Sequence, residues 1–137
     1  MTSDEIMGMI RVHEGYSETV YLDTAGVPTG GYGHAFIVGS HIPVYVAAHL
    51  FWQDVKQAMD DYETLGLELD GVRRGVLVDM LFNLGLTKLL GFVKMLDALR
   101  AGDYTKASLE MKDSDWYGQV KSRAVKLAEM MRTGEKV

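Results

Sequence analysis

The chain contains no cysteine and only two prolines among its 137 residues, and its first dozen residues hold no long apolar run. Without cysteine, disulfides, thiolate nucleophiles and zinc–thiolate sites are excluded, so the fold depends on packing alone. Asp4, Glu5 and Arg11 exclude a secretory signal core or a membrane-spanning helix at the start of the chain. We therefore expect a protein that is made in the cytoplasm and does not insert into a membrane.

Positive charge is also scarce. The chain has 14 lysine and arginine residues against 19 aspartate and glutamate residues, which gives a formal net charge of −5. Because a nucleic-acid surface needs a basic patch, no nucleic acid is expected as a partner. The apolar content of 47% is that of a globular protein, and a single domain of this size buries roughly two-thirds of the surface its unfolded chain exposes.

The pattern of caps and turns predicts a small β region behind a first helix. Residues 2–14 are expected to form the helix, because Thr2 and Glu5 have the spacing of a capping box and Gly15 can end it. Residues 16–37 then carry strand-like aromatic and β-branched residues around a turn, followed by closely spaced glycines. These features predict a hairpin or a three-stranded sheet.

The remainder of the chain is expected to be helical. Pro43 can begin a long helix to about Thr64, and Asp70 can cap a helix through Leu84 whose apolar residues indicate the buried centre of a bundle. Further helices are expected over residues 87–90, 92–101, 103–112 and 121–132, with a short connection at 115–118. The predicted core comprises Leu77, Met80, Leu84, Phe92, Met95, Leu99 and Trp116. The fold class is α+β and mostly helical.

The densest chemistry lies between Glu14 and His34, in EGYSETVYLDTAGVPTGGYGH. Glycosidic bond cleavage needs one protonated carboxyl group that donates to the leaving oxygen and one ionised carboxylate. Glu14 lies where an apolar helix meets a loop, which favours protonation, whereas Asp23 lies in a polar stretch that favours the ionised form. Thr29 offers a hydroxyl group that can hold a water molecule. From spacing alone, a helix-end carboxylate, a turn residue and a strand hydroxyl remain the alternatives.

Further motifs appear in a fixed order along nearly the whole chain. They are Thr29-Gly30-Gly31-Tyr32-Gly33-His34, Arg73-Arg74, Phe82-Asn83-Leu84-Gly85, Gly91-Phe92, Trp116-Tyr117, Arg123-Ala124 and Arg132-Thr133-Gly134. With the spacing of the two carboxylates and Thr29, this ordered set resembles the phage-type lysozymes of glycoside hydrolase family 24, of the T-even type. The resemblance implies one lysozyme-like domain over residues 1–137. A small α+β lobe, about 13–55, would be joined by a long helix to a helical lobe of 1–12 plus 56–137, with a peptidoglycan-binding cleft between them.

The resemblance also implies a mechanism. Glu14 is expected to be the general acid and Asp23 the ionised partner, while the family's threonine, here Thr29, orients the attacking water. Such an arrangement inverts the anomeric centre and predicts a carboxyl separation of roughly 6.5–9.5 Å. The implied activity is hydrolysis of the β-1,4 bond between N-acetylmuramic acid and N-acetylglucosamine in bacterial peptidoglycan, with no metal and no cofactor.

Three other residues are assigned through the resemblance, and two through their place at the end of the buried helix. His34 and Asp54 are expected to form a structural ion pair, although a histidine after glycines also suits a base or a metal ligand. Arg123 is expected to reach Glu14, where a guanidinium group opposes the effect of desolvation; the alternative is a solvated arginine. Phe82 and Asn83 are candidates to line the cleft. A core phenylalanine beside a helix-end polar residue is the alternative for that pair.

The chain departs from the T-even type in its small lobe. Only fifteen residues separate His34 from Leu50, so a helix and loop of that lobe are expected to be missing. The preferred function is a monomeric endolysin for host cell lysis that waits in the host cytoplasm and depends on a separate holin for access to the wall. The alternative is a non-catalytic peptidoglycan-binding or phage-tail structural module that keeps the lysozyme fold.

Overall fold

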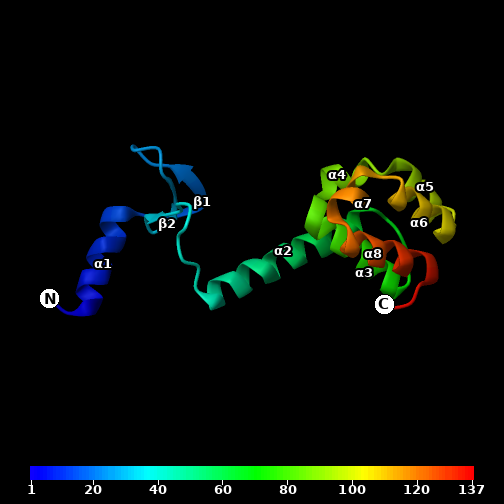
Figure 1. Cartoon of the computed structure of the whole chain (residues 1–137). Helices are drawn as coiled ribbons and strands as arrows, with labels where there is room; N and C mark the ends of the chain where they lie inside the picture. The colour runs from blue at the N-terminus through cyan, green and yellow to red at the C-terminus, as the bar shows by residue number, and fades with distance from the viewer. The chain divides into compact units, whose positions relative to one another are not determined.

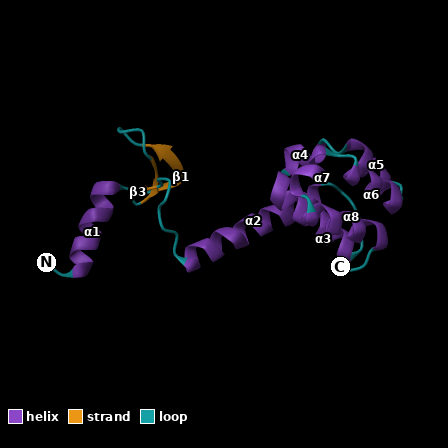
Figure 2. Cartoon of the chain, in the orientation of Figure 1, coloured by secondary structure: helices purple, strands orange, loops and turns teal.

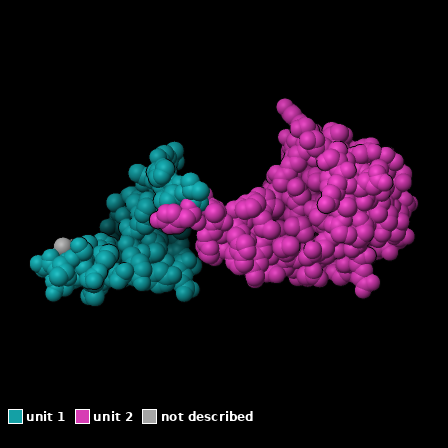
Figure 3. Space-filling view, turned by 90° about the horizontal axis from the view of Figure 1, so that it is seen from below, with its two compact units in different colours: residues 1–44 teal, residues 45–137 magenta. Residues whose placement is uncertain are grey.

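A computed structural model describes the backbone of residues 1–137 and every side chain except that of Ile6. The chain divides into two compact units, Met1–Val44 and Tyr45–Val137 (Figure 3). The two units are described separately below. Within the described residues, no helix has the length and apolar character needed to cross a membrane.

The first unit opens with α1, Ser3–Glu14 (Figure 1). The predicted capping box is present: Glu5 N–H donates to Thr2 Oγ1 at 3.2 Å, and Thr2 N–H donates to Glu5 Oε2 at 2.7 Å. Gly15 ends the helix at φ +69°, a left-handed conformation that favours glycine, and its N–H donates to the Arg11 carbonyl. The sequence therefore places Glu14 at the last position of the helix, as predicted.

A three-stranded antiparallel sheet follows, in the order β1-β2-β3 (Figure 2). Its strands are Ser17–Leu22, Pro28–Gly31 and His34–Ala35. The prediction of a hairpin or a three-stranded sheet is thus confirmed in its second form. A five-residue turn joins β1 to β2, and the two-residue loop Tyr32-Gly33 joins Gly31 to His34.

Among the described residues, helices joined by short connections make up the second unit, and the first of these helices begins at Val44, the last residue of the first unit. Its helices are α2 Val44–Thr64, α3 Gly71–Leu84, α4 Leu86–Leu90, α5 Val93–Arg100, α6 Tyr104–Lys112, α7 Asp115–Val120 and α8 Ser122–Thr133. Asp70 caps α3 through its side chain, as predicted, and Asp103, expected as the first residue of a helix, caps α6 in the same way. The long helix begins one residue after Pro43.

Helix α3 is the centre of this unit. Val76, Leu77, Met80 and Leu81 are all buried, and α8 packs against α3 and α6. Of the seven predicted core residues, five are buried, while Leu84 and Phe92 are partly buried and pack against the core. The apolar surface that α3 removes from water therefore contributes to the stability of this unit, together with the buried residues of α5 and α8.

One predicted connection is wrong. Residues 115–118 belong to α7, which Ser114 caps by accepting a hydrogen bond from Tyr117 N–H at 3.3 Å. Gly118, taken as part of a loop, lies inside this short helix. Lys121, the predicted first residue of the last helix, instead has φ +58° and separates α7 from α8.

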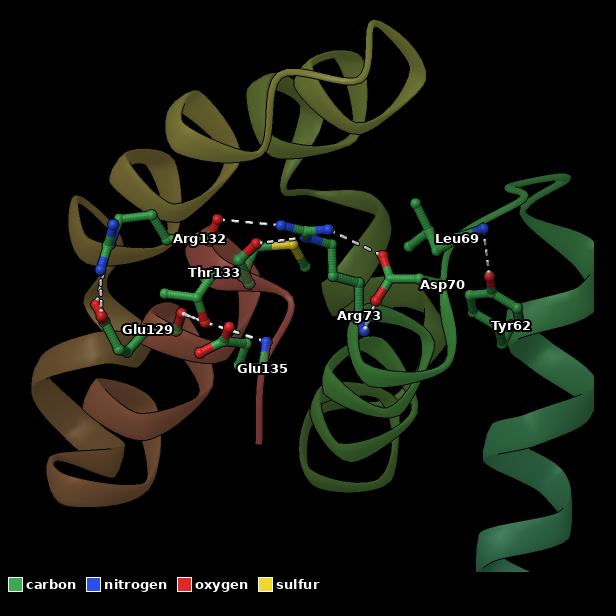
Figure 4. Close-up of polar contacts among 9 residues, drawn as sticks. Tyr62, Leu69, Asp70, Arg73, Glu129, Arg132, Thr133 and Glu135 are labelled. Carbon is green, nitrogen blue, oxygen red and sulfur yellow. Dashed lines mark hydrogen bonds and ion pairs between the residues drawn. The ribbon is translucent and has the colours of Figure 1, made fainter. Parts of the chain in front are cut away.

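Arg73 joins the start of α3 to the end of α8 (Figure 4). Its guanidinium group donates to the Met131 carbonyl at 2.7 Å and the Arg132 carbonyl at 3.0 Å, which caps the last turn of α8. It also pairs with Asp70 at 3.0 Å and lies 3.7 Å from the centre of the Tyr104 ring. Burial raises the pKa of Asp70, but the hydrogen bonds and charge of Arg73 outweigh it, so this pKa lies below its ordinary value.

Candidate active site

Glu14 contacts the loop between β2 and β3. A Cβ atom built on Gly33 would lie 2.5 Å from Glu14 Oε2 and 2.9 Å from its Cδ, so the Glu14 carboxylate rests directly against the Gly33 backbone. In the same loop, the Tyr32 ring lies 5.0 Å from the Tyr16 ring and 5.8 Å from the Arg11 guanidinium carbon. The end of α1 and this loop therefore form one packed structure.

Asp23 lies in the turn between β1 and β2 and is half-buried. Its Oδ1 accepts hydrogen bonds from the N–H groups of Ala25 at 2.9 Å and Val27 at 2.8 Å. Its own backbone N–H donates to the Val27 carbonyl at 3.0 Å, and its carbonyl accepts from Gly26. The carboxylate is thus held in a fixed orientation by the turn itself. Within the described part of the chain, no hydrogen bond is made to Oδ2.

Thr29 is the only buried polar residue among the described side chains of the first unit, with 5% of its surface exposed. It stands opposite Tyr21 on β1 and Ala35 on β3, in the middle of the sheet. Its hydroxyl group donates to the Val27 carbonyl at 2.8 Å. Because that bond uses the only hydroxyl proton, the remaining lone pairs of Oγ1 can only accept, for example from a water molecule.

The three predicted catalytic residues therefore lie in one compact unit, and two of them share a hydrogen-bonding partner in Val27. Carboxylate and hydroxyl oxygens held by backbone groups suit acid–base chemistry on a bound water. Among the side chains that the structure describes, no three His, Asp or Glu residues are arranged to hold a metal ion. The separation of the Glu14 and Asp23 carboxyl groups stays a prediction.

Asn83 and Phe82 end α3 on the second unit. Trp116 Nε1 donates to Asn83 Oδ1 at 2.9 Å, and since an indole N–H can only donate, the amide oxygen must face it. The Asn83 NH2 group is then the part available to a ligand. The Phe82 ring is 39% exposed and lies edge-to-face against Phe51 at 5.7 Å. Their assignment to substrate binding stays a prediction.

Arg123 pairs with a residue that sequence analysis did not identify. Its Nε and Nη2 atoms both lie 2.7 Å from Asp79 Oδ1, which joins α8 to α3. The partners are 44 residues apart, so no local pattern signals the pair. The proposed Glu14–Arg123 and His34–Asp54 pairs each join a residue of one unit to a residue of the other, and both stay predictions. His34 lies on β3, where its ring meets that of Phe36 at 4.8 Å.

A cavity of about 630 Å³ in the second unit was also not predicted. It lies where α3 ends, between the α4–α5 junction and α7. Leu84, Phe92, Met95 and Trp116 supply apolar walls, and Lys88 and Glu110 are among the charged residues that line it. Its volume suits a small molecule or a short peptide.

Residues 11–129 match the phage lysozyme family. The chain is 31% identical over 156 positions to the pre-baseplate central spike protein Gp5 of Enterobacteria phage T4, covering 92% of this chain and 27% of that protein. It is 24% identical to the probable T4-type lysozymes 1 and 2 of Dictyostelium discoideum, covering 94% and 92% of both chains, respectively. The chain thus spans about a quarter of the spike protein and nearly the whole of each Dictyostelium relative. Because the match covers most of the sequence and includes the turn, sheet and bundle described above, the chain belongs to the phage lysozyme family.

Proposed function

We propose that the protein is a muramidase that hydrolyses the β-1,4 bond between N-acetylmuramic acid and N-acetylglucosamine in bacterial peptidoglycan. The observation that carries this proposal is the hydrogen-bonded turn that holds Asp23 and Thr29 on either side of Val27, in the same unit as Glu14. Membership of the lysozyme family supports a glycoside hydrolase chemistry for these oxygens.

Each residue has a separate role. Glu14 donates a proton to the leaving oxygen. This proton transfer needs no group other than Glu14 and the sugar. Asp23 takes a proton from the attacking water through Oδ2, since Oδ1 is occupied by two backbone N–H groups. Thr29 Oγ1 accepts the second hydrogen of that water. A water held by both residues attacks the anomeric carbon from the side opposite the leaving group and inverts its configuration.

Product analysis tests the bond that is cut. Purified peptidoglycan is digested by the wild type and by Glu14→Gln, reduced with borohydride and examined by mass spectrometry. Muramitol at the new ends, formed only by the wild type, supports the proposal. Glucosaminitol ends, or equal products from both proteins, would overturn it. Proton NMR of the first product formed reports the anomer, and retention would contradict the assignment of Asp23.

The match to the T4 spike protein favours a second candidate, a wall-binding structural module of a phage particle. Both candidates bind peptidoglycan, but only the muramidase hydrolyses it. A module that sediments with peptidoglycan but releases no new reducing ends supports the second candidate. For the preferred function, the muramidase, we propose a role in host cell lysis. The protein stays in the host cytoplasm until a separate holin opens the membrane. A monomer is sufficient, since the three proposed catalytic residues belong to one chain.

A further inference from the structure

Among the glycines of the first unit, Gly33 is the one at which an added side chain would collide with the proposed proton donor. The carboxylate oxygen, Cδ and Cγ of Glu14 lie 2.5, 2.9 and 3.2 Å from the place where a Cβ atom of residue 33 would stand. The first two distances are shorter than real Cβ contacts. A hydrogen atom fits there, but a methyl group does not.

The loop that presents Gly33 is fixed against α1 by its neighbour. Gly30 on β2 pairs with His34 on β3, residues 32–33 form the loop between the two strands, and Gly33 adopts φ +75°. Tyr32 lies against Tyr16 and Arg11, which follow and precede Glu14 in the sequence. Two aromatic or cation–π contacts therefore hold the loop at the end of α1, where the Gly33 backbone meets the Glu14 carboxylate.

We propose that Gly33 is a positioning residue for catalysis, and that its backbone forms the surface against which the Glu14 carboxyl group is held for proton donation. The proposal rests on the proposed role of Glu14. A glutamate has three rotatable bonds, so a packed surface is needed to select one carboxyl position. Misplacing a reacting group by about 1 Å can cost about a hundredfold in rate.

The clash also predicts what kind of damage a substitution does. Because the colliding atoms are the far end of a flexible side chain, Glu14 can turn away from a Cβ atom at little cost in stability. The carboxyl group then leaves its position while the fold persists. Gly33→Ala is therefore expected to lower kcat about a hundredfold with little change in KM, since substrate binding does not require the proton donor.

Gly31 supplies a matched control. It is the last residue of β2, where that loop begins, and has φ +59°, so Gly31→Ala carries the same left-handed backbone strain, but no atom lies within 4 Å of its Cβ position. The full-length wild type, Gly33→Ala, Gly31→Ala and Glu14→Gln are compared by reducing-end release from solubilised peptidoglycan, with urea unfolding of each. The proposal predicts similar stability for the two alanine variants and a kcat at least about tenfold lower for Gly33→Ala. Equal kcat values in an active protein would overturn it.

A second measurement does not depend on activity. The carboxyl carbon of Glu14, assigned by comparison with Glu14→Gln in protein labelled at glutamate, is observed by carbon-13 NMR at fixed pH. Its chemical shift is expected to change in Gly33→Ala and to stay close to the wild type in Gly31→Ala. An unchanged chemical shift in Gly33→Ala would contradict the contact between the Glu14 carboxyl group and the Gly33 backbone. If the wild type releases no reducing ends although the shift changes, the muramidase assignment fails and the contact itself stands.

Discussion

Asp23 and Thr29 are held by the two ends of a single residue: Val27 N–H donates to Asp23 Oδ1 at 2.8 Å, and the Val27 carbonyl accepts from Thr29 Oγ1 at 2.8 Å. The turn between β1 and β2 therefore sets the position of the proposed base and the proposed water ligand together. A substitution that keeps these bonds and changes only charge or hydroxyl chemistry can separate structure from function.

Asp23→Asn makes that separation for the carboxylate. The amide oxygen of asparagine can still accept from Ala25 and Val27, so the turn and the free energy of unfolding should change little. The side chain can no longer take a proton from water, and kcat should fall by about a hundredfold or more. Reducing-end release measures the fall in kcat, and thermal unfolding checks that the stability is unchanged. Near-normal turnover in a folded Asp23→Asn protein would remove Asp23 from the mechanism.

Thr29→Val, with Thr29→Ser as its control, tests the hydroxyl group. Valine keeps the shape but removes one of the two hydrogen bonds that the Val27 carbonyl accepts, the other coming from Asp23 N–H, so the loss of stability should be about 1 kcal/mol or less. Turnover should fall about tenfold to a hundredfold because no oxygen remains to hold the water. Serine restores the oxygen and should restore most of the rate. Equal rates for the valine and serine variants would contradict the assignment.

Asn83→Ala should act mainly through Trp116. The indole is buried with 4% of its surface exposed, so loss of the Asn83 oxygen leaves its N–H without an acceptor and should cost about 1–3 kcal/mol. Phenylalanine has no indole N–H group, so Asn83→Ala should cost much less stability in a protein that also carries Trp116→Phe. Urea unfolding of the four proteins in this cycle measures the difference. Purely additive losses would show that the bond contributes nothing.

Arg73→Lys should destabilise the second unit, and Arg74→Lys is its neighbouring control. Lysine cannot reach the Met131 and Arg132 carbonyls and Asp70 together, because it lacks the planar fork of arginine. A loss of about 2–3 kcal/mol is expected for residue 73. Arg74 makes a 3.7 Å pair with an exposed Glu63 and lies 5.4 Å from the centre of the Tyr62 ring, and lysine can keep a positive charge near both, so its replacement should change stability by about 0.5 kcal/mol or less. Similar losses in the free energy of unfolding for Arg73→Lys and Arg74→Lys would contradict the special role of Arg73.

The low pKa of Asp70 gives a pH dependence with a definite sign. Because its folded pKa is below the ordinary value, its charge stabilises the fold at neutral pH, and this contribution is lost as pH falls from about 4 through the folded pKa. Asp70→Asn keeps a good helix cap and removes the charge. The stability difference from the wild type should be about 1 kcal/mol or less at pH 7, since the side chain is 41% exposed, and should shrink toward pH 2.5. A difference that grows on acidification would have the wrong sign.

Local signals predicted most of the fold. The capping box of Thr2 and Glu5, the Asp70 cap and Gly15 at the end of a helix all act through hydrogen bonds to near neighbours, and the structure contains each of them. Helix α7 was missed because six residues are too few for an apolar period, and Gly118 suggests a loop. Ser114 followed by Asp115 was the signal that marked its start.

Long-range contacts were beyond sequence patterns. The Asp79–Arg123 pair, the contacts of Arg73 with the end of α8 and the cavity beside Trp116 all depend on how helices pack. The contact of Gly33 with Glu14 depends on the loop that Tyr32 holds against α1. The relatives align over 156 to 160 positions against 137 residues here, so they contain residues without a counterpart in this chain, and the location of the missing segment after His34 stays a prediction.

The most direct test of the proposed activity is clearing of chloroform-treated Gram-negative cells by the wild type beside Glu14→Gln. Circular dichroism confirms that both proteins are folded, and sedimentation with the wall confirms that both bind. If the protein is a muramidase that uses Glu14 as its proton donor, the wild type clears the cells and Glu14→Gln does not. Clearing by Glu14→Gln at the rate of the wild type would contradict the catalytic assignment, and binding without clearing by the wild type would point to a structural module.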